Sequence, residues 1–195
     1  MSEEYAEDYS NLEMMATAGA RQINDKEVIF VGTGLPMLAS MLALRTHAPN
    51  STIMYESGYI GCNNKDVARI IGDIRLMRDL AQVTDMMNVL GLLQTGEVDI
   101  GFLGGAQIDK YGNVNATTIG DYDDPTVRLP GSGGAMDIAS NAKRTMMITV
   151  HEKRRFPEKV DYITSPGWID GPDGRENAGL RWGGPQKVVT DLAIM

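Results

Sequence analysis

The stretch Ser51-Thr52-Ile53-Met54-Tyr55-Glu56-Ser57-Gly58 decides the fold that we expect for this chain. Residues 51–55 are mostly apolar, which is typical of a buried strand, and Ser57-Gly58 is typical of the sharp loop that follows one. In an open α/β sheet, ligands bind outside the carboxyl ends of the strands. Glu56 stands at such an end, and this position is typical of a catalytic group. The same spacing also fits a glutamate that caps a nearby helix or is simply solvated.

Strand, glycine loop and helix follow one another in this order elsewhere in the chain. The apolar run 27–31 leads into Gly32-Thr33-Gly34, and Pro36 suits the first turn of a helix that extends to about Thr46. The other elements that we predict are a helix at 11–23, a helix at 84–95 with Thr84 as its N-cap and Gly96 as its stop, and strands at 98–103, 145–150, 160–164 and 187–190.

This order of elements predicts an α/β fold, with an open, mostly parallel sheet flanked by helices on both faces. At this length one core and one domain are the default expectation. We assign that domain to residues 11–195 and an acidic N-terminal tail to residues 1–10.

Composition narrows the class of function and the compartment. The net charge of −8 and the isoelectric point near 4.7 argue against a nucleic-acid surface, which needs clustered Lys and Arg. A single cysteine excludes a disulfide framework within the chain, which fits a reducing compartment. The acidic N-terminus does not resemble a signal peptide, and no stretch approaches the roughly 20 apolar residues of a membrane span. We therefore expect a soluble, cytoplasmic protein that binds neither nucleic acid nor membrane.

Three glycine-rich segments are candidate ligand-binding loops. Gly32-Thr33-Gly34 lacks the third glycine of a dinucleotide fingerprint, because Met37 stands in its place, so we interpret it as a tight turn. The segment 131–135 offers unhindered backbone N–H groups ahead of a short helix that begins near Met136, and such groups can face a developing oxyanion. A flexible loop is the alternative.

The third segment, Gly104-Gly105-Ala106-Gln107, follows a predicted strand, and the amide of Gln107 could donate to a carbonyl oxygen. A β-bulge or close packing that requires glycine is the alternative. Cys62 has no histidine near it in sequence, and we interpret it as a packed residue and not a nucleophile. No histidine or cysteine pair has metal-binding spacing, so we predict no metal site.

Seven segments in the same order resemble the β subunits of the class I CoA-transferase family, and in particular its glutaconate branch. They are Val31-Gly32-Thr33-Gly34-Leu35-Pro36, Glu56-Ser57-Gly58, Gly104-Gly105-Ala106-Gln107-Ile108-Asp109 with Tyr111–Asn115, Ile119-Gly120-Asp121-Tyr122, Gly131-Ser132-Gly133-Gly134-Ala135, His151–Phe156 and Thr164–Pro172. The resemblance implies a fold of the CoA-transferase type. Family members of this branch usually extend several dozen residues beyond the position of Met195, so the domain looks shortened at its C-terminus.

The resemblance also implies roles for Glu56 and for the loop 131–135, and the other glycine loops supply further candidates from their own residues. Glu56 would be the nucleophile, and Gly133, Gly134 and Ala135 would lie beside it and contact the acyl-CoA thioester. Candidates for further contacts, of the oxyanion-binding kind or at the strand-to-helix turn, are Gly105, Ala106, Gln107, Gly32 and Gly34.

The implied enzyme is a heteromer of this β-type chain with an α subunit, and its active site lies at their junction. It moves CoA between an acyl-CoA and a carboxylic acid, with a dicarboxylate such as glutaconate as the first guess. Coenzyme A is then a substrate, and no permanently bound cofactor is expected. The alternatives are a hydrolase or decarboxylase acting on a CoA thioester, and a non-catalytic CoA-binding subunit.

Overall fold

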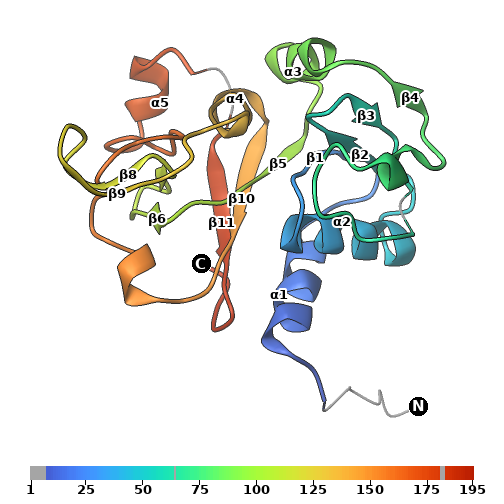
Figure 1. Ribbon diagram of the computed structural model, residues 1–195, viewed down its shortest axis with the longest axis horizontal. Coiled ribbons are helices and arrows are strands. Elements are labelled where there is room, and N and C mark those ends of the chain that lie inside the picture. Colours follow the sequence, from blue (N-terminus) through green and yellow to red (C-terminus); the bar gives the residue numbers. More distant parts are fainter. Residues whose placement is uncertain (1–7, 64, 181–182) are drawn as a thin grey trace.

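A seven-stranded sheet runs through the computed structural model, which describes residues 8–63, 65–180 and 183–195 (Figure 1). Its strand order is β11-β10-β5-β1-β2-β3-β4. The parallel strands are β1 (Val28–Phe30), β2 (Thr52–Tyr55), β5 (Ile100–Leu103), β10 (Arg144–Ile148) and β11 (Pro185–Val189). Two short strands, β3 (Tyr59–Ile60) and β4 (Gln82–Val83), continue the sheet in antiparallel fashion. The prediction of a mostly parallel sheet is confirmed.

Helices cover both faces of this sheet, as the sequence predicts. Two core clusters share the strands between them: Ile29 and Ile53 belong to the cluster of α1 (Asn11–Ala20) and α2 (Leu35–Thr46). Phe30 belongs to the second cluster, and the helices on that side are α3 (Met86–Gln94) and α4 (Ala135–Asn141). Because successive side chains of a strand point to opposite faces, an unbroken apolar run fills both cores.

A second group of short elements lies beside the β11 edge of the sheet, on the left of Figure 1. It consists of two hairpins, a helix and a 3-10 turn. These are β6 (Gln107–Ile108) with β7 (Val114–Asn115), β8 (Thr118–Gly120) with β9 (Pro125–Arg128), α5 (Gly174–Asn177) and η2 (Lys153–Arg155). A further 3-10 turn, η1 (Ile74–Met77), precedes β4. No local pattern in the sequence predicts these hairpins.

Several sequence-based predictions were wrong in detail. The first helix ends at Ala20 and not at 23, and Ser10 caps its start by a capping box with Glu13. The N-cap of α3 is Asp85 and not Thr84, since the Asp85 carboxylate accepts from the backbone N–H of Asn88. Most of the predicted acidic tail, residues 1–7, lies outside the described residues.

No strand forms at 160–164, where the sequence predicts one. The backbone N–H groups of Thr164 and Ser165 both donate to the carbonyl of Val114, and this contact is a single bridge. The segment pairs with Val114 of the β6–β7 hairpin and with no strand of the main sheet. No helix in the described part of the chain is long and apolar enough to cross a membrane.

Candidate active site

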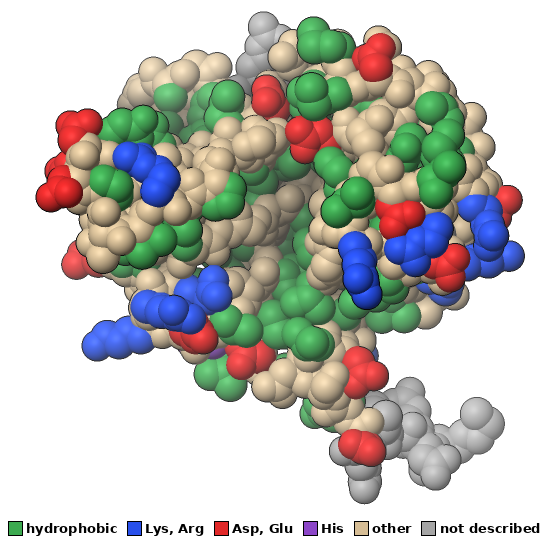
Figure 2. Space-filling model, in the orientation of Figure 1, with side chains coloured by type: hydrophobic (Ala, Val, Ile, Leu, Met, Phe, Trp, Pro, Cys, Tyr) green, Lys and Arg blue, Asp and Glu red, His purple; other side chains and the backbone are tan. Residues whose placement is uncertain are grey.

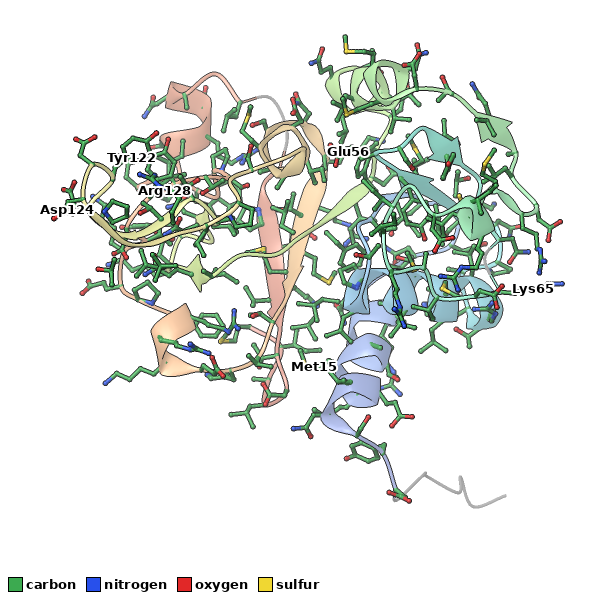
Figure 3. All side chains as sticks on the ribbon, viewed as in Figure 1. Met15, Glu56, Lys65, Tyr122, Asp124 and Arg128 are labelled. Atoms are coloured by element: carbon green, nitrogen blue, oxygen red, sulfur yellow. The ribbon has the colours of Figure 1, made fainter. Side chains whose placement is uncertain are left out.

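The topology places the carboxyl ends of β1, β2 and β5 side by side. From β1, the chain passes through α2 to β2 on one side and later returns to place β5 on the other. Such a switch in direction opens a crevice at the carboxyl ends of the central strands. Figure 2 shows a hollow in the middle of this face of the molecule. Figure 3, in the same view, places Glu56 beside that hollow, between β2 and α4.

Glu56 sits in a tight turn that its neighbours hold from three sides. The backbone N–H of Gly58 donates to the carbonyl of Tyr55 at 3.0 Å, and the Ser57 hydroxyl donates to the carbonyl of Ile71 at 2.6 Å. Gly58 has a φ of +96°, and any Cβ there would collide with the carbonyl of Thr84. Only glycine suits such a turn, so Gly58 fixes where the half-buried Glu56 side chain emerges.

The loop 131–135 meets Glu56 directly. A Cβ placed on Gly134 would lie 3.0 Å from Cδ of Glu56 and 3.1 Å from each of its carboxylate oxygens. Only the absence of a side chain at Gly134, the N-cap of α4, lets the backbone come this close. The structure therefore brings the candidate nucleophile and one of its predicted neighbours into contact.

Glu56 and the loop 131–135 both have polar groups that the described part of the chain leaves without a hydrogen bond. Within the part of the chain that the structure describes, the carboxylate of Glu56 accepts no hydrogen bond, and the backbone N–H groups of Gly133 and Gly134 donate none. Gly133 has a φ of +49° and open space where a Cβ would stand. The N–H of Ala135 donates to the carbonyl of Ser132 at 2.9 Å. Ala135 therefore closes the turn, and the two glycines carry the free donors.

The β1 loop borders the same turn. The N–H of Val31 donates to the carbonyl of Met54 at 3.1 Å, so the loop that follows β1 starts next to the end of β2. Gly32 and Gly34 both face open space, and Gly34, with a φ of +79°, is the N-cap of α2. This loop can admit a ligand close to its backbone.

The loop after β5 is organised differently. A Cβ on Gly105 would collide with the side chain of Val114, and the N–H of Ala106 donates to the carbonyl of Asn115 at 2.7 Å. The side chain of Gln107 is buried, donating to Asp161 at 2.9 Å and accepting from Asn115 at 2.7 Å. These bonds favour the packing alternative for Gly105, Ala106 and Gln107. The sequence gives no local signal for Asp161 as an anchor of this loop, because it lies 54 residues from Gln107, and Asn115 reaches Gln107 only through the pairing of β6 with β7.

The other reactive side chains serve the framework. Cys62 is buried, and burial raises the pKa of its thiol to about 12, so it is no nucleophile at neutral pH. His47 contacts the carbonyl of Ile23 through its ring at 3.0 Å, and His151 contacts the hydroxyl of Thr190. Among the residues described, no three His, Cys, Asp or Glu side chains gather closely enough to hold a metal ion.

Known proteins share both the sequence and this architecture. A family model described as coenzyme A transferase matches residues 12–195. The chain is 47% identical over 193 residues to the β subunit of glutaconate CoA-transferase from Acidaminococcus fermentans, covering 96% of this chain and 72% of that protein. It is 44% identical over 192 residues to the β subunit of 3-oxoadipate CoA-transferase from Pseudomonas knackmussii, with the same coverage of 96% and 72%. The crystal structure of the Acidaminococcus fermentans glutaconate coenzyme A-transferase matches with a TM-score of 0.90 and 46% identity, over 96% of this chain and 74% of that one.

Proposed function

The chain belongs to the coenzyme A transferase family, and on that premise we propose that it is the β subunit of a heteromeric CoA-transferase in which Glu56 is the nucleophile. The observation that carries the proposal is the close approach of the backbone at Gly134 to the Glu56 carboxylate, in a loop where the N–H groups of Gly133 and Gly134 have no acceptor among the described residues. A half-buried carboxylate with free lone pairs can attack an electrophile, and adjacent donors can receive the charge that develops.

The reaction proceeds by two displacements at carbonyl carbons. A carboxylate oxygen of Glu56 attacks the thioester carbon of the donor acyl-CoA, the C–S bond breaks, and CoA leaves as the thiolate. The thiolate then attacks the glutamyl carbonyl of the resulting anhydride, and the donor acid leaves as its carboxylate. Glu56 now carries CoA as a thioester, and an acceptor carboxylate reverses both steps. Water and net proton transfer are not needed, and ping-pong kinetics follow.

Each displacement passes through a tetrahedral oxyanion that needs stabilisation. We assign this role to the N–H groups of Gly133 and Gly134, in the loop that comes close to Glu56 at Gly134. In other enzymes the loss of one such donor costs about 2.7–4 kcal/mol of transition-state stabilisation. The open β1 loop, with Gly32 and Gly34, borders the same space and admits part of the substrate. Coenzyme A enters and leaves as substrate, and the chemistry requires no resident cofactor.

The substrate class and the partner follow from the relatives. Both relatives are β subunits, and both of their enzymes are named for a dicarboxylate, glutaconate or 3-oxoadipate. We assign a dicarboxylic acid and its CoA thioester as the substrates of this chain. An α subunit is the partner that completes the enzyme.

Trapping the covalent intermediate tests the proposal. The enzyme reconstituted with its α subunit is mixed with glutaryl-CoA or glutaconyl-CoA in the absence of acceptor and then treated with borohydride. Peptide mass spectrometry over residues 55–65 should find Glu56 reduced to its alcohol, because borohydride reduces a thioester and leaves a carboxylate intact.

Two variants serve as controls for this experiment. Glu56→Gln should lose both the reduced product and turnover, whereas Glu97→Gln, at an exposed glutamate, should keep both. Release of free CoA with an unmodified Glu56 would replace the transferase assignment with a hydrolase. Unchanged turnover in Glu56→Gln would show that this chain does not carry the nucleophile.

A further inference from the structure

Arg175 of α5 is a buried cation. Its exposed fraction is 3%, and it lies far in sequence from every glycine loop. Burial lowers the pKa of its guanidinium, yet arginine stays protonated in proteins, so the charge must be satisfied inside. Backbone carbonyls of two segments accept hydrogen bonds from the guanidinium. Because both segments bind the same side chain, Arg175 holds them together.

The first of these segments is the last turn of α4. The Nη2 of Arg175 donates to the carbonyl of Ala139 at 3.0 Å and to that of Ser140 at 3.5 Å. Carbonyls in the last turn of a helix lack partners within the helix, and a cation there is favourable. The Nη1 donates to the carbonyls of Pro166 and Gly167, both at 3.1 Å. Arg175 therefore ties α4 to the loop 166–167.

The opposite end of α4 carries the contact with Glu56. Ile138, in the middle of α4, packs closely on Gly101 of β5. A Cβ added at Gly101 would collide with the Ile138 side chain. Gly134 precedes the first residue of α4 and touches the Glu56 carboxylate. A helix rises roughly 1.5 Å per residue, so about 7.5 Å of helical backbone separates the Arg175 anchor at Ala139 from the Glu56 contact at Gly134. A shift at one end of α4 is thus transmitted to the other.

From this arrangement we infer that Arg175 is a positioning residue, which sets the N–H groups of Gly133 and Gly134 against the reacting centre at Glu56. The inference rests on the proposed function for its effect on the reaction. Arg175 is buried and donates to backbone carbonyls, so its loss should lower kcat through misplaced donors and leave substrate affinity largely intact. If Arg175 had a purely structural role, its loss would lower the stability of the protein, and the molecules that remain folded would keep their kcat.

The test compares Arg175→Met, Arg175→Lys and the matched control Arg144→Met in the reconstituted enzyme. Arg144 is also largely buried, and its Nη2 donates to both carboxylate oxygens of Glu27 and to the carbonyl of Gln22. It therefore controls for the loss of an anchored arginine that does not hold α4. For each variant we would measure kcat, KM, the urea midpoint and the amide exchange of peptide 131–141.

We expect Arg175→Met to lower kcat by about 10- to 100-fold and to change KM by less than about threefold. Amide exchange at 131–136 should become faster in this variant. Arg144→Met should lower the urea midpoint and leave kcat and the exchange at 131–136 within about twofold of wild type. Arg175→Lys keeps the charge but fewer donors, and it should fall between Arg175→Met and wild type.

Unchanged exchange at 131–136 in Arg175→Met, or in Arg175→Lys if the first variant does not fold, would overturn the inference. Equal losses of kcat in the Arg175 and Arg144 variants would also overturn it, because the role would then be structural. Failure of the proposed function would look different. Wild-type enzyme would then give no borohydride-trapped Glu56, while the exchange comparison would still report whether Arg175 holds the loop.

Discussion

Replacing Gly134 with alanine adds one methyl group at the contact that defines the candidate active site. Ordinary van der Waals contacts begin at 3.4 Å, whereas the new Cβ would stand 3.0 Å from Cδ of Glu56 and 3.1 Å from its oxygens. The carboxylate must therefore move away by 0.3–0.4 Å, the difference between these distances. The backbone itself is not strained, because Gly134 has φ −77° and ψ 0°, which alanine adopts readily.

This displacement sets the size of the expected effect. A misplacement of about 1 Å in an active site can cost about 100-fold in rate. Scaled logarithmically, 0.3–0.4 Å corresponds to a fall in kcat of about four- to sixfold, or roughly 1 kcal/mol in the activation barrier. Stability should fall by only about 0.5–1 kcal/mol, the difference between glycine and alanine at an N-cap.

The assay is steady-state CoA transfer by the reconstituted enzyme, with borohydride trapping of Glu56 beside it. Gly91→Ala is the matched control, because Gly91 lies inside α3 with open space around its Cβ position. That substitution should stabilise the protein by about 0.5–1 kcal/mol and leave kcat unchanged. If Gly134→Ala retains kcat and the yield of trapped Glu56 within twofold of wild type, the contact does not set the position of the nucleophile, and the reasoning is refuted.

Three further predictions concern the surroundings of the site. Gly101→Ala should cost about 1–3 kcal/mol in urea unfolding through overpacking against Ile138, and it should also lower kcat, because it pushes α4 off the sheet; full activity in a destabilised variant would contradict this. Asn115→Ala should cost about 2–4 kcal/mol, because it removes the hydrogen bonds that its amide donates to Gln107 and to the carbonyl of Thr118, and those that it accepts from the backbone N–H groups of Thr117 and Thr118; an unchanged urea midpoint would count against the network. Burial raises the pKa of Cys62 from 9.0 to about 12, so the unfolded chain loses the thiol proton first and the stability that this thiol contributes is lost between pH 9 and pH 12. Urea titrations at pH 8 and pH 10 should show that slope in wild type and less of it in Cys62→Ala, and native protein at pH 8 should resist iodoacetamide; rapid alkylation without unfolding would show that the thiol is accessible.

The sequence by itself determined the elements that depend on short-range patterns. Apolar runs followed by glycine marked β1, β2 and β5 and the helices between them, since burial on both faces of a parallel strand requires an unbroken apolar run. The same pattern placed Glu56 at the carboxyl end of β2. The sequence does not fix the ends of the helices. Thr84 and Asp85 are both good N-cap residues, and the backbone geometry shows that Asp85 is the N-cap of α3.

The tertiary structure alone decided which residues meet. The segment 160–164 is rich enough in strand formers to predict a strand, but a strand requires a partner to pair with over several residues, and this segment meets only Val114, in a single bridge next to it at Ser165. The contact of Gly134 with Glu56, the burial of Gln107 and the anchoring of α4 by Arg175 all join segments far apart in the chain. Local propensity carries no information about such contacts, because they are fixed by how the helices pack on the sheet.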